Sequence, residues 1–161
     1  MAVEYRKLET EDDFAQASEL QRQVFGFSDL DLVSPHMLRL VARNTPPLGV
    51  HLGAFVTDGP TPQLVGVLFG FSTFLEKSIY VTLMGVLPEY QEGLYGHRLL
   101  LKFREVCLRN NIHTMYGVYD PMAANLARLY TGGVGFLGTQ FLSGRIFFRW
   151  DFLSEHTLAK L

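Results

Sequence analysis

The sequence predicts a mixed α/β fold (α+β) in a single domain that spans residues 1–161. Three strand-like segments separated by short turns occupy the middle of the chain, which is typical of an antiparallel meander. The pattern then changes to strand, helix and strand, and a crossover helix of this length implies a central parallel pair of strands. We therefore expect a mostly antiparallel sheet of about seven strands, flanked by about four helices.

Capping signals mark the helices in the first third of the chain. Thr10 precedes three acidic residues and is expected to cap a helix that runs to about Val24, with a glycine closing it. Ser34 and Pro35 predict a second helix start, because serine is a favoured N-cap and proline is favoured at the first helical position.

The remaining elements follow from apolar periodicity. The segment 64–75 is nearly continuously apolar, as in a strand buried on both faces. Leu99, Phe103 and Val106 recur at helical spacing and predict a helix after the meander. The expected strands are 3–8, 50–57, 64–75, 79–86, 112–118, 136–141 and 145–150, and a last helix is expected at 121–130.

Composition excludes several classes of protein. Apolar residues make up 48% of the chain and charged residues 19%, so the chain can build a packed core. The net charge is -2, which argues against a nucleic-acid partner. There is no signal-peptide pattern and no apolar run of about 20 residues, so no membrane partner is expected. A single cysteine, Cys107, suits a reducing compartment, and we expect a cytoplasmic protein in which it is a buried apolar residue.

The segment 86–100 carries the strongest chemical signal. A strand ends at Val86 and a helix begins several residues later, and the first amides of a helix bind phosphate well. Gly93 and Gly96 let a ligand approach the backbone, and Arg98 supplies a cation. The position also suits a ligand, which in α/β sheets lies beyond the carboxyl ends of the strands. Glycines in such a loop are also common as simple turn residues, so the pattern alone leaves both interpretations open.

Other motifs are absent from the sequence. No Gly-Lys-Ser/Thr follows the loop, and the spacing of a dinucleotide-binding loop is missing. No His, Cys and Asp cluster has metal-ligand spacing, so no metal is expected. No Gly-x-Ser-x-Gly motif of a hydrolase is present.

The loop resembles the acyl-CoA motif of the GCN5-related N-acetyltransferases, the GNAT superfamily. That motif runs Val-x-Pro, an aromatic residue, Gln/Arg-x-x-Gly-x-Gly/Ala, and then Leu-Leu. The matching residues are Val86, Pro88, Tyr90, Gln91, Gly96, Leu99 and Leu100. The order of elements matches over nearly the whole chain. A second match, similar to an uncharacterised bacterial branch of predicted acetyltransferases, consists of Asp120-Pro121, Asn125, Leu129-Tyr130 and Gly135-Phe136.

The resemblance implies acetyl-CoA or another acyl-CoA as co-substrate, and a small-molecule or peptide amine as acceptor. The amine would attack the thioester directly, and Tyr130 would be the catalytic general acid that protonates the leaving thiolate. The pantetheine arm would lie along the strand that ends at Val86, and the pyrophosphate would meet the amides of residues 92–97. The implied cofactor-binding residues are Met84, Gly85, Val86, Gln91, Glu92, Gly93, Leu94, Tyr95, Gly96, His97, Arg98 and Asn125.

Two departures from the family pattern leave alternatives open. Leu94 stands where the motif has its first glycine, and the gap from Tyr130 to Gly135 is one residue longer than usual. Tyr130 is therefore either the general acid or an aromatic residue that packs on the sheet. No convincing base is present, since Glu76 lies at a turn and Thr82 is not a strong base. Asp120 either serves function at a strand end or caps the following helix.

Single histidines and aromatic residues have two interpretations each. The scattered histidines His36, His51, His97 and His113 are more often structural than catalytic. Aromatic residues near the meander would be core or would line an apolar acceptor pocket. These are Phe25, Phe27, Phe69, Phe71, Phe74 and Tyr80. Aromatic residues of the last two strands are expected to pack between the subunits of a possible homodimer. These are Phe141, Phe147, Phe148 and Trp150.

Three functions are compatible with the sequence. The first is an acyl-CoA-dependent N-acyltransferase. The second is a catalytically degenerate module that binds acyl-CoA as a sensor or regulator, which Leu94 and the missing base favour. The third is a structural domain whose loop binds nothing, which the motif match makes the weakest of the three.

Overall fold

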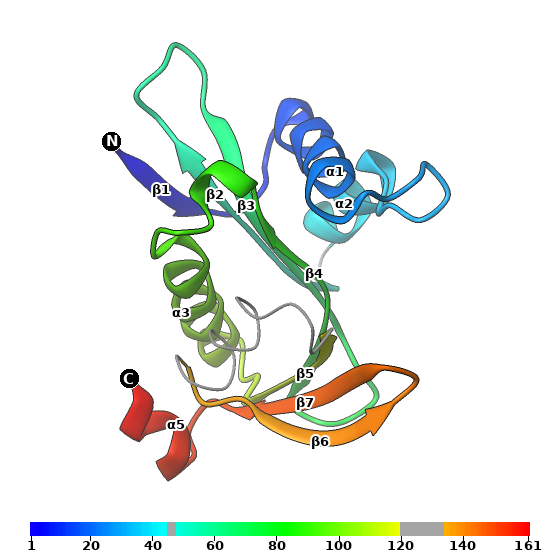
Figure 1. Ribbon diagram of the computed structural model, residues 1–161, viewed down its shortest axis with the longest axis vertical. Coiled ribbons are helices and arrows are strands. Elements are labelled where there is room, and N and C mark those ends of the chain that lie inside the picture. The colour runs from blue at the N-terminus through cyan, green and yellow to red at the C-terminus, as the bar shows by residue number, and fades with distance from the viewer. Residues whose placement is uncertain (45–47, 120–133) are drawn as a thin grey trace.

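A seven-stranded mixed sheet forms the centre of the molecule (Figure 1). The computed structural model describes residues 1–44, 48–119 and 134–161. The strand order is β1-β2-β3-β4-β5-β7-β6, and every neighbouring pair is antiparallel except β4 and β5. The strands are β1 (Val3–Arg6), β2 (Gly49–Val56), β3 (Gln63–Ser72), β4 (Ser78–Val86), β5 (Thr114–Tyr119), β6 (Leu137–Leu142) and β7 (Arg145–Asp151). The predicted mostly antiparallel sheet with a central parallel pair is confirmed.

Four α-helices lie within the described residues. They are α1 (Glu11–Phe25), α2 (Pro35–Arg43), α3 (Tyr95–Arg109) and α5 (Glu155–Lys160), and a short 3-10 turn, η1, spans Pro88–Tyr90. The predicted caps are confirmed: the Thr10 side chain accepts from the amide of Asp13, and Ser34 accepts from Met37. Gly26 ends α1 at a φ of 67°, in the left-handed region that glycine adopts readily.

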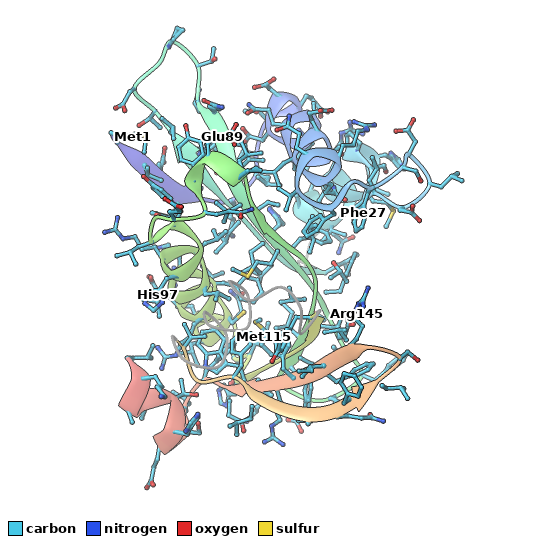
Figure 2. All side chains as sticks on the ribbon, in the orientation of Figure 1. Met1, Phe27, Glu89, His97, Met115 and Arg145 are labelled. Carbon is cyan, nitrogen blue, oxygen red and sulfur yellow. The ribbon has the colours of Figure 1, made fainter. Side chains whose placement is uncertain are left out.

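The helices cover the two faces of the sheet. In Figure 1, α1 and α2 lie to one side of the central strands and α3 lies to the other. Under α1 and α2 lies a core that includes Phe14, Leu20 and Phe55, and under α3 lies a second core that includes Phe103 and the β5 residue Met115, labelled in Figure 2. Burying each such side chain contributes about 1.5–3 kcal/mol, so the two cores hold the strands in place.

The centre of β3 is buried on both faces, as predicted. Leu64 to Gly70 are all buried, because helices cover the strand on either side. The strand ends at Ser72, three residues before the predicted end, because Phe74 and Leu75 are exposed in the β3–β4 turn.

Two expectations for the C-terminal part need correction. The sequence reading missed helix α5, although Ser154 caps it by accepting from the amide of Thr157. Phe148 and Trp150 are buried in the core beneath α3, where Phe136 stacks on Phe148 with ring centroids 4.3 Å apart. These two aromatic residues therefore cannot form a subunit interface, and only Phe141 of the predicted set is largely exposed. The helix expected at 121–130 lies outside the described residues.

The parallel pair β4–β5 is short. The strands pair only where Ser78–Tyr80 meet Thr114–Tyr116. The other edge of β4 pairs with β3 as far as Val86. The register of this pair shifts once, because Phe69 pairs with Leu83 but the next residue, Gly70, pairs with Val81. Thr82 is therefore the extra residue of a β-bulge, a feature that often lies next to active sites. The two strands diverge beyond Tyr80, so β4 continues toward α3 without β5 beside it.

No helix in the described residues is both long and apolar enough to cross a membrane.

Replacing Asp13 with asparagine should test the buried ion pair that begins α1. Burial opposes ionisation of Asp13, but the Arg6 guanidinium at 2.7 Å and the amides of Glu9 and Thr10 lower the pKa of the carboxyl to about 2. Because this pKa lies below the unfolded value, the carboxylate stabilises the fold above about pH 4, and this stabilisation is lost as the pH falls toward 2. We expect Asp13→Asn to lower the free energy of unfolding at pH 7 by about 2–3 kcal/mol.

Urea unfolding between pH 7 and pH 2 measures this effect, with Asp12→Asn, an exposed position one residue earlier, as the control. Equal losses in the two variants, or an acid dependence that Asp13→Asn leaves unchanged, would contradict the assignment.

Candidate functional site

The segment 86–98 forms a compact connection between β4 and α3. Leu87 is buried, and the 3-10 turn Pro88–Tyr90 reverses the direction of the chain. The Gln91 side chain then donates from Nε2 to the carbonyl of Val86 at 2.9 Å. This hydrogen bond joins the residues on either side of the 3-10 turn and so holds the loop closed.

The first turn of α3 presents a row of open backbone donors. The first hydrogen bond of the helix runs from the amide of Arg98 to the carbonyl of Leu94 at 2.9 Å. Among the described residues no acceptor is found for the amides of Glu92, Leu94, Tyr95, Gly96 and His97. Unpaired donors and the positive end of the helix dipole favour a bound anion. Of the amides of residues 92–97 named in the sequence prediction, five are therefore open, and that of Gly93 donates to the carbonyl of Tyr90 at 3.3 Å.

The structure explains how leucine can replace the motif glycine at position 94. Leu94 has a φ of -91°, which any residue adopts, and its side chain is 62% exposed. Gly93 is the position that needs a small residue, because a Cβ there would lie 2.5 Å from the ring of Tyr95. Tyr95 in turn meets Tyr90 edge to face, with ring centroids 5.6 Å apart. Glycine at position 93 thus leaves room for the Tyr95 ring, and the backbone at position 94 does not require glycine.

Tyr5 of β1 lies beneath the first turn of α3 and was missed in the sequence. Its hydroxyl is buried and has no hydrogen-bond partner among the described residues. Burial raises the pKa of Tyr5, while the nearby guanidinium of Arg98 opposes the increase. Arg98 itself is exposed on α3, so its charge lies at the same end of the helix as the open amides.

Near its end, β4 is packed against helices on both faces of the sheet. The Met84 side chain is buried in the core with Leu99 and Leu100 of α3. A Cβ on Gly85 would lie 3.0 Å from the ring of Phe25, so α1 packs directly on the backbone there. Contact of a ligand with the backbone of residues 84–86 stays a prediction.

The candidate catalytic residues are only partly described. Tyr130, Asn125 and Asp120 lie outside the described residues, so their roles stay predictions. Within residues 1–44, 48–119 and 134–161, no group of three or more His, Cys, Asp or Glu side chains is placed to hold a metal ion.

The other titratable candidates have structural surroundings. His51 is buried, its Nδ1 accepts from the amide of Leu8 at 3.3 Å, and burial lowers its pKa to about 4. Neutral His51 therefore fixes the chain between β1 and α1. Cys107 is fully buried in α3, and burial raises the pKa of its thiol. Glu76 is exposed in the β3–β4 turn, as expected.

Comparison with known proteins decides the fold. No protein-family model and no curated protein sequence matches the chain. Solved structures do match, among them a GNAT-family acetyltransferase from Staphylococcus aureus Mu50. That match has a TM-score of 0.71 and 14% identity, and it covers 93% of this chain and 99% of the other. The chain has the GNAT fold.

Two further structures with the GNAT fold contain ligands. PaiA N-acetyltransferase from Thermoplasma acidophilum, solved with coenzyme A, matches with a TM-score of 0.70 and 16% identity, over 94% of this chain and 99% of the other. A chain of the NatC complex bound to Gag peptide and CoA matches with a TM-score of 0.74 and 16% identity, over 94% of this chain and 99% of that one. These similarities establish the fold that the sequence resemblance implied.

Proposed function

We propose that residues 1–161 form an acetyl-CoA-dependent N-acetyltransferase that transfers its acetyl group to a primary amine. The observation that carries this proposal is the set of open amides between Glu92 and His97, placed directly beyond the end of β4. Helix N-termini bind phosphate oxygens, and a pyrophosphate offers several. The GNAT structure of PaiA, solved with coenzyme A, and the matched GNAT sequence motif support CoA as the molecule that carries this pyrophosphate.

The divergence of β4 from β5 supplies a place for the pantetheine arm. The pairing with β5 ends at Tyr80, and the six residues 81–86 that complete β4 span roughly 20 Å of extended backbone. A pantetheine arm pairs with such a strand through its amide groups, as an added strand would. Its thioester would then lie near the bulge at Thr82, where the irregular backbone directs its polar groups away from the regular ladder.

The proposed reaction is direct transfer. The amine nitrogen attacks the carbonyl carbon of the thioester, a C–N bond forms, the C–S bond breaks, and the thiolate of CoA leaves. The amine loses one proton and the thiolate gains one. We keep Tyr130 as the proposed acid and Asn125 as a proposed contact of the pantetheine arm, on the strength of the sequence motif. A cytoplasmic location and a homodimer likewise stay predictions.

A degenerate acyl-CoA-binding module is the alternative. It is favoured by Leu94 and by the side chains near the bulge. Among the described residues next to Thr82, neither Val81 nor Leu83 is titratable, and Thr82 itself accepts no proton readily. Such a module would bind CoA through the same open amides but would not release it from acetyl-CoA in the presence of amines.

Thiol release separates these functions. The protein is incubated with acetyl-CoA and a panel of aliphatic, aromatic and peptide amines, and free CoA is measured with a thiol reagent. We expect amine-dependent release and a raised melting temperature with CoA. A thermal shift without release supports the degenerate module, and the absence of both would show that the loop does not bind CoA.

Gly96→Asp should abolish CoA binding while leaving the fold intact. An aspartate in the first turn suits the helix dipole, but its carboxylate repels the phosphates. Titration calorimetry with CoA measures the loss, which we expect to exceed 100-fold, about 2.7 kcal/mol. Gly59→Asp is the matched control, because it adds the same side chain in an exposed turn where a Cβ meets only the Thr61 carbonyl, at 3.8 Å. Unchanged CoA affinity in Gly96→Asp would place the site elsewhere.

Leu94→Gly restores the glycine of the family motif. Because Leu94 is exposed and has an ordinary φ, its removal costs the fold little, and we expect CoA affinity to stay equal or to increase. The same calorimetric titration with CoA measures the affinity of this variant. A clear loss of affinity would instead assign the leucine side chain to the pocket of another ligand.

A further inference from the structure

A groove of about 350 Å³ lies at the base of the diverging strands. Tyr80 of β4 and Tyr116 of β5 are direct partners in the last pair of the parallel ladder, and both line this groove. Phe147 of β7 and Gln140 of β6, which pair with each other, line its other side. Leu75 from the β3–β4 turn also lines it. Of the aromatic residues expected near an acceptor pocket, only Tyr80 lines this groove. Tyr116 was missed, and Phe147 was expected at a subunit interface instead.

The two tyrosines of the groove lie on the sheet face opposite to α3, whereas Phe148, which also lines it, belongs to the core beneath α3. Ile79 and Met115, the neighbours of Tyr80 and Tyr116 along their strands, point into the core beneath α3. Successive side chains alternate between faces, so both tyrosines lie on the other face. A CoA molecule bound at the N-terminus of α3 would therefore reach the diverging strands from one side. The groove adjoins the same strands from the other side.

The lining of the groove is aromatic and without formal charge. Its described residues include four aromatic residues, Leu75, and the neutral polar groups of Thr73, Thr139 and Gln140, and they include no Asp, Glu, His, Lys or Arg. Arg149, the partner of Tyr116 across the β5–β7 pair, is already held by the Asp151 carboxylate through contacts of 2.9 and 2.8 Å. The groove therefore favours a ring over a carboxylate or a strongly charged peptide.

We propose that this groove binds the ring of the acceptor, so that the substrate is a small primary alkylamine that bears an aromatic ring. A volume of about 350 Å³ is at the lower end of ligand pockets and suits a single-ring molecule. Aromatic rings pack edge to face or offset on one another, and ring faces also attract an ammonium group before it loses its proton. This inference rests on the proposed acetyltransferase function and names its substrate class.

Steady-state thiol release with 2-phenylethylamine, n-butylamine and an alanine-initiated tetrapeptide tests the substrate class. We expect kcat/KM for 2-phenylethylamine to be at least tenfold higher than for the other two amines. Tyr116→Ala and Phe147→Ala should each lower that value about tenfold and change the value for n-butylamine little, while Tyr116→Phe retains it. Phe141→Ala is the control, because Phe141 is exposed and does not line the groove. Its partner across the strands, Ile146, packs on the core beneath α3, and paired residues share a face of the sheet.

A binding measurement separates failure of this inference from failure of the proposed function. Saturation-transfer NMR detects contact between the ring protons of 2-phenylethylamine and the CoA-saturated protein, whether or not turnover occurs. Ring contact that Tyr116→Ala abolishes supports the groove. Absence of ring contact, or turnover that favours n-butylamine or the peptide and is unaffected by Tyr116→Ala, overturns the inference and leaves the acetyltransferase proposal in place. If the protein does not bind CoA, the acetyltransferase proposal is wrong. Contact between 2-phenylethylamine and the unliganded protein then tests whether the groove binds an aromatic ring.

Discussion

The short parallel pairing between β4 and β5 is the constraint on which the rest of the structure depends. Pairing ends after Tyr80 and Tyr116, while β4 continues to Val86 beside β3. Beyond Tyr80 no described strand pairs with this edge of β4, and near its end the strand is packed on both faces. Met84 lies in the core beneath α3, and α1 packs on Gly85. Hydrophobic burial thus helps to hold the end of β4 beyond the point where β5 pairs with it.

Helix α3 begins just beyond the end of β4, and its packing fixes the position of its first amides. Leu99, Leu100 and Phe103 are fully buried on its inner face, and Arg104 donates to the carbonyl of Phe152 at 2.8 Å. The helix is therefore fixed along its length, and its first amides stay open at the end of β4. Open amides near water cost little, but they gain much from an anion in a fixed position. The fixed position of α3 therefore supports the proposal that the loop binds an anion.

Local chemistry predicted most of the fold. The caps Thr10 and Ser34 and the apolar run of β3 were readable because each depends on residues a few positions apart. Helix α5 was missed because its six residues carry a weak periodic signal, and only the cap Ser154 marked it. Phe148 and Trp150 were misassigned because alternation alone does not say which face of a strand is covered.

The sequence by itself determined the loop between β4 and α3, since a strand end, two glycines and a helix start lie within 15 consecutive residues. It also indicated the GNAT fold through the gapless motif. Only the tertiary structure decided what adjoins that loop. Tyr5 beneath α3, and the groove formed by Tyr80, Tyr116 and Phe147, bring together residues from distant strands. Such contacts follow from strand order and register, which are set by the packing of the whole sheet and leave no pattern in any one segment.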